Sequence, residues 1–242
     1  MENKDDLGKL VSAVTVYLDE LRTSGVEGLP FGKSAEQVKS GADGIKGETL
    51  DDIRAELGDC CCCSLGETRT NLVFGVGNPH ADIVFVGEAP GRDEDLKGEP
   101  FVGEAGQILT RMITRMGLTR QDVYICNVLK CRPPNNRNPH ADEIEKCSPF
   151  MLRQVRAIGP KAIVALGTFA SQTLLANREP IGRLRGRFHD YHGVPLMPTV
   201  HPSYLLRNRG NNDLLWTVWE DMVQVLNLLK MPVPEVKRQG KG

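Results

Sequence analysis

Short apolar runs alternate with longer helical patterns along most of this 242-residue chain. The predicted strands are residues 81–86, 123–128, 162–166 and 194–200, and the predicted helices are 105–116, 141–158, 168–176 and 213–229. Pro149 predicts a break in the second of these helices. Strands that alternate with helices favour a parallel sheet covered on both faces, which is a three-layer αβα fold. Ligands of such sheets bind beyond the carboxyl ends of the strands.

The first 50 residues follow a different pattern. Apolar residues on one face predict an amphipathic helix over residues 6–22, and a glycine-rich linker follows as far as residue 50. We therefore expect an N-terminal segment of residues 1–50, one domain of residues 51–232 and a flexible tail of residues 233–242. The N-terminal helix either packs back on its own domain or binds a protein partner.

The composition is that of a soluble globular protein, with 40% hydrophobic and 25% charged residues. No apolar stretch is long enough to cross a membrane and the N-terminus lacks a secretory pattern, so we expect a cytoplasmic protein. We also expect a monomer. The net charge of −1 is unevenly distributed along the chain. Up to Asp59 there are 7 basic and 13 acidic residues, and after Asp59 there are 23 basic and 18 acidic residues. A basic surface on the main domain is compatible with phosphate contact, although a solvated arginine-rich loop is the alternative.

Seven cysteines are many for a chain from a reducing compartment, so a metal site or catalysis is favoured over disulfides. Cys60 to Cys63 are consecutive, and a C-x2-C pair among them can join the distant pair Cys131 and Cys147 at one centre. Cys60 and Cys63 are the natural choice, although a shifted register would also serve. Zinc and a [4Fe–4S] cluster both accept four thiolates, and the spacing does not separate them.

Three motifs follow predicted strands. They are Gly-Glu-Ala-Pro-Gly at 87–91, Asn-Val-Leu-Lys-Cys-Arg-Pro-Pro at 127–134 and His-Pro-Ser-Tyr-Leu-Leu-Arg at 201–207. Together with the cysteines, they resemble the family 4, iron–sulfur class of uracil-DNA glycosylases over roughly residues 60–229. The resemblance implies a mainly parallel four-stranded sheet and a [4Fe–4S] cluster held by four cysteines, Cys60, Cys63, Cys131 and Cys147. It also implies base excision repair, in which uracil is flipped out of DNA and its N-glycosidic bond is hydrolysed to leave an abasic site.

The same resemblance assigns roles to four pocket residues. Phe101 stacks on the uracil ring, and Glu88 excludes the methyl group of thymine. Asn127 donates to O4 and accepts from N3–H, a pattern that rejects cytosine. His201 donates to O2 and stabilises the uracil anion as the bond breaks, which makes Asn127 and His201 candidate catalytic residues.

Water activation and DNA contact complete the expected site. The backbone amide of Ala89 contacts uracil, but Ala89 occupies the position where related enzymes carry a water-activating aspartate. Glu94 is therefore the candidate for assisting the water. The candidate DNA contacts are Leu205, Leu206, Arg207, Arg185 and Arg187.

Other functions remain open from the sequence. One is a superfamily member with broader specificity, and another is a member that crosslinks to DNA through a histidine in a longer basic insertion. The corresponding segment here, 183–189, is short, although it ends in His189. A redox-sensing iron–sulfur protein that binds nucleic acid is the alternative from another class. No lysine in the motifs is placed as a Schiff-base nucleophile, so we expect no strand cleavage.

Overall fold

A computed structural model describes residues 47–236. The predicted helix over 6–22, most of the glycine-rich linker and the end of the C-terminal tail lie outside these residues. The elements are α2 (Leu50–Leu57), α3 (Leu65–Thr68), β1 (Val76–Gly77), β2 (Ile83–Gly87), α4 (Arg92–Lys97), α5 (Glu104–Arg115), β3 (Tyr124–Asn127), η2 (Pro134–Asn136), α6 (Ala141–Ile158), β4 (Ala162–Leu166), α7 (Gly167–Leu175), α8 (Ile181–Leu184), β5 (His189–Tyr191), β6 (Val194–Thr199), α9 (Pro202–Arg207) and α10 (Asn212–Leu228). No helix in the described part is both long and apolar enough to cross a membrane.

The sheet has six strands in the order β1-β3-β2-β4-β6-β5. The four inner strands are parallel to one another, which confirms the predicted parallel sheet. The two edge strands β1 and β5 are antiparallel to their neighbours and were not predicted. They contain only two and three residues, which is too short for a strand period to show in the sequence.

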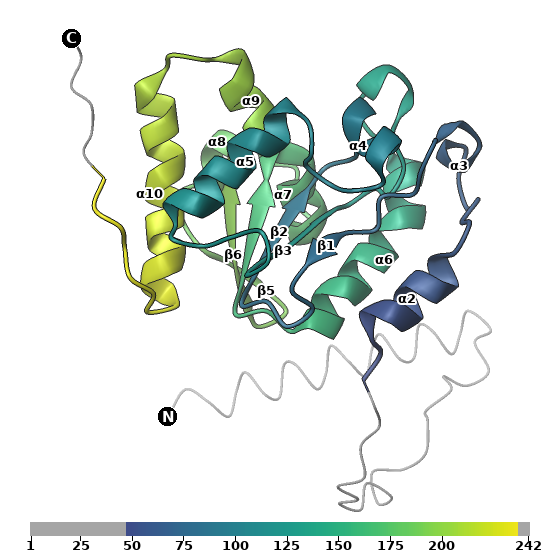
Figure 1. The fold of residues 1–242 in the computed structure, drawn as a ribbon, viewed down its shortest axis with the longest axis horizontal. Helices are drawn as coiled ribbons and strands as arrows, with labels where there is room; N and C mark the ends of the chain where they lie inside the picture. Colours follow the sequence, from purple (N-terminus) through teal and green to yellow (C-terminus); the bar gives the residue numbers. More distant parts are fainter. Residues whose placement is uncertain (1–46, 237–242) are drawn as a thin grey trace, which may run out of the picture. The chain divides into compact units, whose positions relative to one another are not determined.

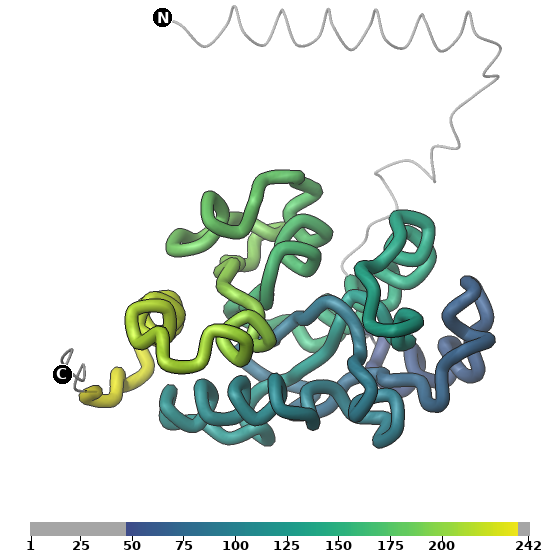
Figure 2. The backbone as a smooth tube through the Cα atoms, turned by 90° about the horizontal axis from the view of Figure 1, so that it is seen from above, coloured from purple at the N-terminus to yellow at the C-terminus, as the bar shows by residue number. Residues whose placement is uncertain are grey.

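Helices cover both faces of the sheet (Figures 1 and 2). Ile83 and Phe85 of β2 point to one face, where they pack in a core with α5, α9 and α10. Val84 and Val86 point to the other face and pack with α6 and α7. Successive strand residues face opposite ways, so a run that is buried throughout requires cover on both sides. The predicted three-layer αβα fold is confirmed.

Helix α6 is continuous through Pro149, so the predicted break is wrong. Proline lacks an N–H group, and the carbonyl of Glu145 consequently has no intrahelical donor. Both residues lie on the exposed side of the helix, where water can satisfy that carbonyl. The helix therefore runs unbroken from Ala141 to Ile158 and carries Cys147 in its first half.

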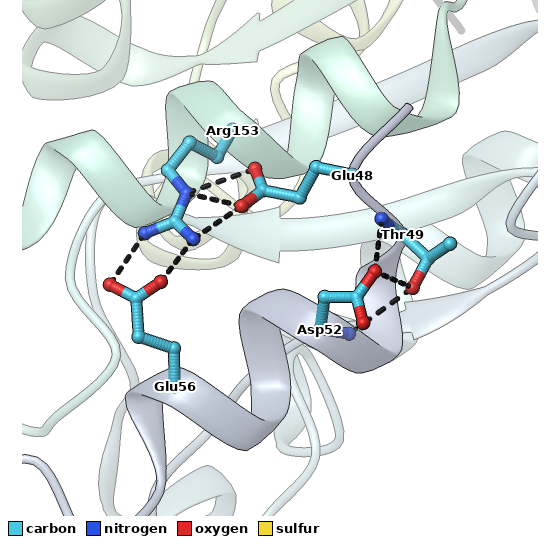
Figure 3. A network of polar contacts seen from close by, with 5 residues as sticks. All are labelled: Glu48, Thr49, Asp52, Glu56 and Arg153. Carbon is cyan, nitrogen blue, oxygen red and sulfur yellow. Dashed lines mark hydrogen bonds and ion pairs between the residues drawn. The ribbon is translucent and has the colours of Figure 1, made fainter. Parts of the chain in front are cut away.

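Helix α2 is fixed to α6 by a network of charged side chains (Figure 3). Thr49 caps α2 in a reciprocal arrangement with Asp52. Arg153 of α6 binds the carboxylates of both Glu48 and Glu56, one before the helix and one in its last turn. The cysteine run begins three residues after α2 ends, so this network brings that run toward α6.

Candidate active site and cysteine site

Asn127 ends β3 with its side-chain amide in an unusual environment. The residue is 1% exposed, and neither the amide nitrogen nor the amide oxygen has a hydrogen-bond partner within the described chain. Burial of an amide without partners is costly, and native proteins rarely tolerate it without a functional reason. An amide in this state can both donate to and accept from a ligand.

Gly87, which ends the neighbouring strand β2, allows two side chains to converge. A Cβ atom at residue 87 would lie 2.3 Å from Asn127 Oδ1 and 2.5 Å from Phe101 Cζ. Only glycine therefore permits the amide and the aromatic ring to approach the same point of the backbone. Phe101 in turn lies beside His201, with ring centroids 5.8 Å apart and planes inclined by 36°. The structure thus brings together Asn127, Phe101 and His201, which lie far apart in the sequence.

The backbone of Phe101 is held in the left-handed region, with φ at 54°. Such a conformation costs about 1–3 kcal/mol for a residue other than glycine, so the surroundings must impose it. Arg120 does so, because its guanidinium donates to the carbonyl of Pro100 at 2.8 Å and to that of Phe101 at 3.1 Å. Nothing in the sequence marks Arg120 for this role, since the contact spans 19 residues.

His201 lies at the N-terminus of α9, and its hydrogen bonds define its tautomer. The backbone N–H of Ser203 donates to His201 Nδ1 at 3.1 Å. An N–H group cannot accept, so Nδ1 carries no proton and the neutral ring carries it on Nε2. Burial, with a contribution from nearby Arg207, lowers the pKa of His201 to about 4. At neutral pH the imidazole is therefore uncharged, and its one donor is Nε2–H.

Glu88 and Ala89 follow Gly87 in the turn after β2, and both are half-buried. Burial raises the pKa of Glu88 to about 7, well above that of an exposed carboxyl. The turn itself is tied to the neighbouring strand end, because Leu129 N–H donates to the Glu88 carbonyl at 3.0 Å. The two turns that carry Glu88 and Asn127 are thus held together.

The side-chain carboxylate of Glu94 is hydrogen-bonded to backbone N–H groups. Its carboxylate accepts from the N–H groups of Gly91, Val102 and Gly103 at 2.9–3.1 Å. These bonds join α4 to the loop that carries Phe101. The structure therefore gives Glu94 a role in joining the turn after β2 to the loop that carries Phe101, which the sequence did not suggest.

The five predicted DNA contacts have different surroundings. Leu206 is half-buried, and Arg207 and Arg187 are exposed. Leu205, by contrast, is 5% exposed and lies in the core beneath α5. Arg185 forms an ion pair with Asp221 at 2.7 Å and also donates to the carbonyl of Thr217. Leu205 and Arg185 are thus committed to contacts inside the protein.

The four predicted cysteine ligands line one small cavity between the loop after α2, the segment after β3 and α6. Arg69 donates to Cys131 Sγ at 3.4 Å, and the backbone N–H of Lys130 donates to Cys147 Sγ at 3.2 Å. Cys62 also borders the cavity, whereas Cys61 is exposed and its thiol donates to the carbonyl of Asp59.

The chemistry of this cavity fits a thiolate-bound metal group. Burial raises the pKa of Cys147 to about 11, so its thiolate needs a positive partner. N–H groups that point at sulfur are typical surroundings of iron–sulfur ligands. Within residues 47–236, however, no three histidine, cysteine or acidic side chains are already gathered closely enough to hold a metal ion.

A parallel sheet with a buried amide at one strand end, and with an aromatic ring and a neutral imidazole from nearby loops beside it, is an α/β arrangement suited to a flat, polar ligand. Comparison with known proteins narrows this class, because the family model described as the uracil DNA glycosylase superfamily matches residues 74–223. The type-4 uracil-DNA glycosylase of Archaeoglobus fulgidus is 53% identical over 167 residues, which cover 66% of this chain and 84% of that protein.

Two further type-4 uracil-DNA glycosylases are each 45% identical. The one from Thermotoga maritima matches over 76% of this chain and 96% of its own length. The one from Saccharolobus solfataricus matches over 66% of this chain and 79% of its own length. The chain therefore belongs to the uracil-DNA glycosylase superfamily and, within it, to the type-4 family.

Proposed function

We propose that this chain removes uracil from DNA by hydrolysing the N-glycosidic bond and leaving an abasic site. The observation that carries the proposal is the Asn127 amide, which is buried at a strand end with both polar atoms unpartnered. The uracil edge supplies an acceptor at O4 and a donor at N3–H, which complement this amide. Cytosine presents the reverse pattern and would leave both groups unsatisfied.

The remaining pocket residues complete the recognition of a base flipped out of the duplex. The ring of Phe101, 5.8 Å from that of His201, provides the stacking surface. Glu88 occupies the turn beside the pocket and blocks the 5-methyl group of thymine. The backbone amide of Ala89 lies in the same turn and contributes a further donor to the base.

His201 supplies the charge stabilisation on which the reaction depends. When the N-glycosidic bond breaks, its electron pair stays with uracil and the sugar becomes oxocarbenium-like. The Nε2–H group of neutral His201 donates to uracil O2 as negative charge develops there. Water then adds to the sugar carbon and loses a proton to solvent, and the uracil anion takes up one proton, so the products are neutral uracil and the abasic sugar.

Glu94 contributes to this reaction by holding the loop of Phe101 in place. Both of its oxygens already accept backbone N–H groups, so the carboxylate is a positioning group for the pocket. Ala89 cannot activate water through its side chain. On the DNA side, Leu206 fills the space left by the flipped base, and the exposed Arg207 and Arg187 bind phosphates.

Cys60, Cys63, Cys131 and Cys147 would hold a [4Fe–4S] cluster in their shared cavity. Such a cluster supplies a cross-link between the loop after α2, the segment after β3 and helix α6. Substitution of Cys147 by serine would therefore lower both the iron content and the thermal stability of the protein. The cluster lies outside the chemical step that the pocket residues perform.

The test is an excision assay on a labelled oligonucleotide that contains one uracil, in which alkali cleaves the abasic product. We expect scission with wild-type protein, and a rate about 10²–10³-fold lower for His201→Asn, whose shorter side chain cannot place a donor at the position of Nε2. His80→Asn, at an exposed histidine, is the matched control and should retain the wild-type rate. The absence of scission with iron-loaded wild-type protein would overturn the proposal.

A further inference from the structure

Lys130 is a fully buried lysine that the proposed reaction does not use. Its side chain is 0% exposed, although lysine is among the residues least often found in a protein core. The residue stands three positions after Asn127 and immediately before Cys131 in the sequence. It therefore occupies the short segment that joins the base pocket to the cysteine site.

The amine of Lys130 folds back onto the start of this segment. Nζ donates to the backbone carbonyl of Asn127 at 2.8 Å and to Gln154 Oε1 at 2.6 Å. Both partners accept, so the amine makes these bonds in either protonation state. The amide of Gln154 is itself oriented, because its nitrogen donates to the carbonyl of Phe74 at 3.0 Å and to the hydroxyl of Tyr124 at 3.3 Å.

The backbone of Lys130 is held on both sides as well. Its N–H donates to Cys147 Sγ at 3.2 Å, and its carbonyl accepts from Val73 N–H at 2.8 Å. Lys130 is thus bonded at the same time to a cysteine of the cavity, to the loop before β1 and to the strand end that carries the pocket amide. Among these contacts, only the bond to Asn127 reaches the base pocket.

We propose that Lys130 is a positioning residue that fixes the base-recognising Asn127 from within the cysteine-bearing segment. The carbonyl and the side chain of Asn127 share one Cα atom, so a rotation of the peptide group would also move the amide. A displacement of about 1 Å in such a group can cost about 10²-fold in rate. The inference rests on the proposed role of Asn127 and extends it to a residue outside the pocket.

Binding measurements with two DNA duplexes distinguish a positioning role of Lys130 from a merely structural one. One contains an uncleavable 2′-fluorinated uracil nucleotide, and the other carries a tetrahydrofuran abasic analogue at the same place. For Lys130→Met, which keeps the length of the side chain but removes the donor, we expect about tenfold weaker binding of the uracil duplex. Binding of the abasic duplex and the iron content should stay at wild-type values, while the melting temperature should fall because two buried acceptors lose their donor. Lys161→Met, at an exposed lysine paired with Asp82, is the control and should match wild type throughout.

Unchanged affinity for both duplexes, or a parallel loss for both, would overturn the role of Lys130. If Lys130→Met does not fold or loses iron, Gln154→Leu takes its place, because it removes the second acceptor of the amine. That variant should bind the uracil duplex about threefold more weakly and bind the abasic duplex as wild type does. Wild-type affinities for both duplexes would refute the coupling between Lys130 and Asn127.

Asn127→Ala shows whether the coupling acts through the amide. It should lose the preference for the uracil duplex at least as fully as Lys130→Met. If it keeps that preference while Lys130→Met loses it, the proposed coupling is wrong. Failure of the function itself has a different signature, namely the absence of uracil excision by wild-type protein.

Discussion

Replacement of Asn127 by leucine should make the free protein more stable and nearly inactive. Leucine has the same number of side-chain heavy atoms in the same branched arrangement, and the neighbours Gly87 and Phe101 present no polar side-chain group that would lose a partner. The two unpartnered amide atoms are buried, and a buried polar group without a partner costs about 1–3 kcal/mol. Removal of that cost should raise the free energy of unfolding by a similar amount.

For a domain of this size, the gain corresponds to a rise in Tm of roughly 2–10 °C. It can be measured by circular dichroism in the absence of DNA. The excision rate of Asn127→Leu should fall at least about 10²-fold, because the amide donor for uracil O4 and the amide acceptor for N3–H are both lost. Stability and activity should therefore change in opposite directions.

Thr199→Val provides the matched comparison. Thr199 is equally buried, but its hydroxyl donates to Asp221 at 2.6 Å, so its loss leaves a carboxylate short of one partner. This variant should be destabilised by about 1–3 kcal/mol. A loss of stability in Asn127→Leu as large as that in Thr199→Val would refute the idea that the unpartnered amide of Asn127 costs stability.

Three further changes test other parts of the structure. The pKa of His201 falls from 6.5 to about 4 on folding, so the unfolded chain binds the extra proton between these values and stability falls as pH drops through them. His201 contributes a loss of up to about 3 kcal/mol, whereas Glu88, whose pKa is raised to about 7, contributes the opposite change over the same range. His201→Asn should remove only the His201 contribution, so its stability between about pH 7 and about pH 4.5 should fall by about 3 kcal/mol less than that of wild type in urea titrations. A variant whose stability changes with pH as in wild type would contradict this assignment. Arg120→Met frees the carbonyls that hold Phe101, and it should raise KM for uracil-containing DNA about tenfold. Unchanged kinetics would exclude that role for Arg120. Arg187→Glu should weaken DNA binding and lower the slope of log K against log salt by about one, whereas an unaltered slope would argue against phosphate contact.

Local patterns in the sequence were sufficient to predict the layers of the fold. The inner strands are buried on both faces and five to six residues long in three cases, so they appear as continuous apolar runs. The edge strands β1 and β5 are too short to produce a period. The break predicted at Pro149 failed because the lost hydrogen bond falls on the exposed side of α6, which the sequence alone does not reveal.

The placement of Asn127 and His201 at or just after strand ends was predictable from the motifs that carry them. The surroundings of other residues depend on contacts distant in the chain. Arg185 binds Asp221, 36 residues away, and the carboxylate of Glu94 reaches the loop of Phe101. No local sequence pattern indicates such partners. The sequence alone therefore does not distinguish an arginine that binds inside the protein from one that is available to DNA.

The left-handed conformation of Phe101 also bears on the thermodynamics of base capture. Arg120 fixes the backbone that carries this ring before any ligand arrives, and the loss of freedom in this loop is therefore incurred during folding. Binding then needs little further ordering of the stacking surface. Calorimetry should show a less unfavourable binding entropy for wild type than for Arg120→Met. In that variant the base itself must immobilise the ring of Phe101.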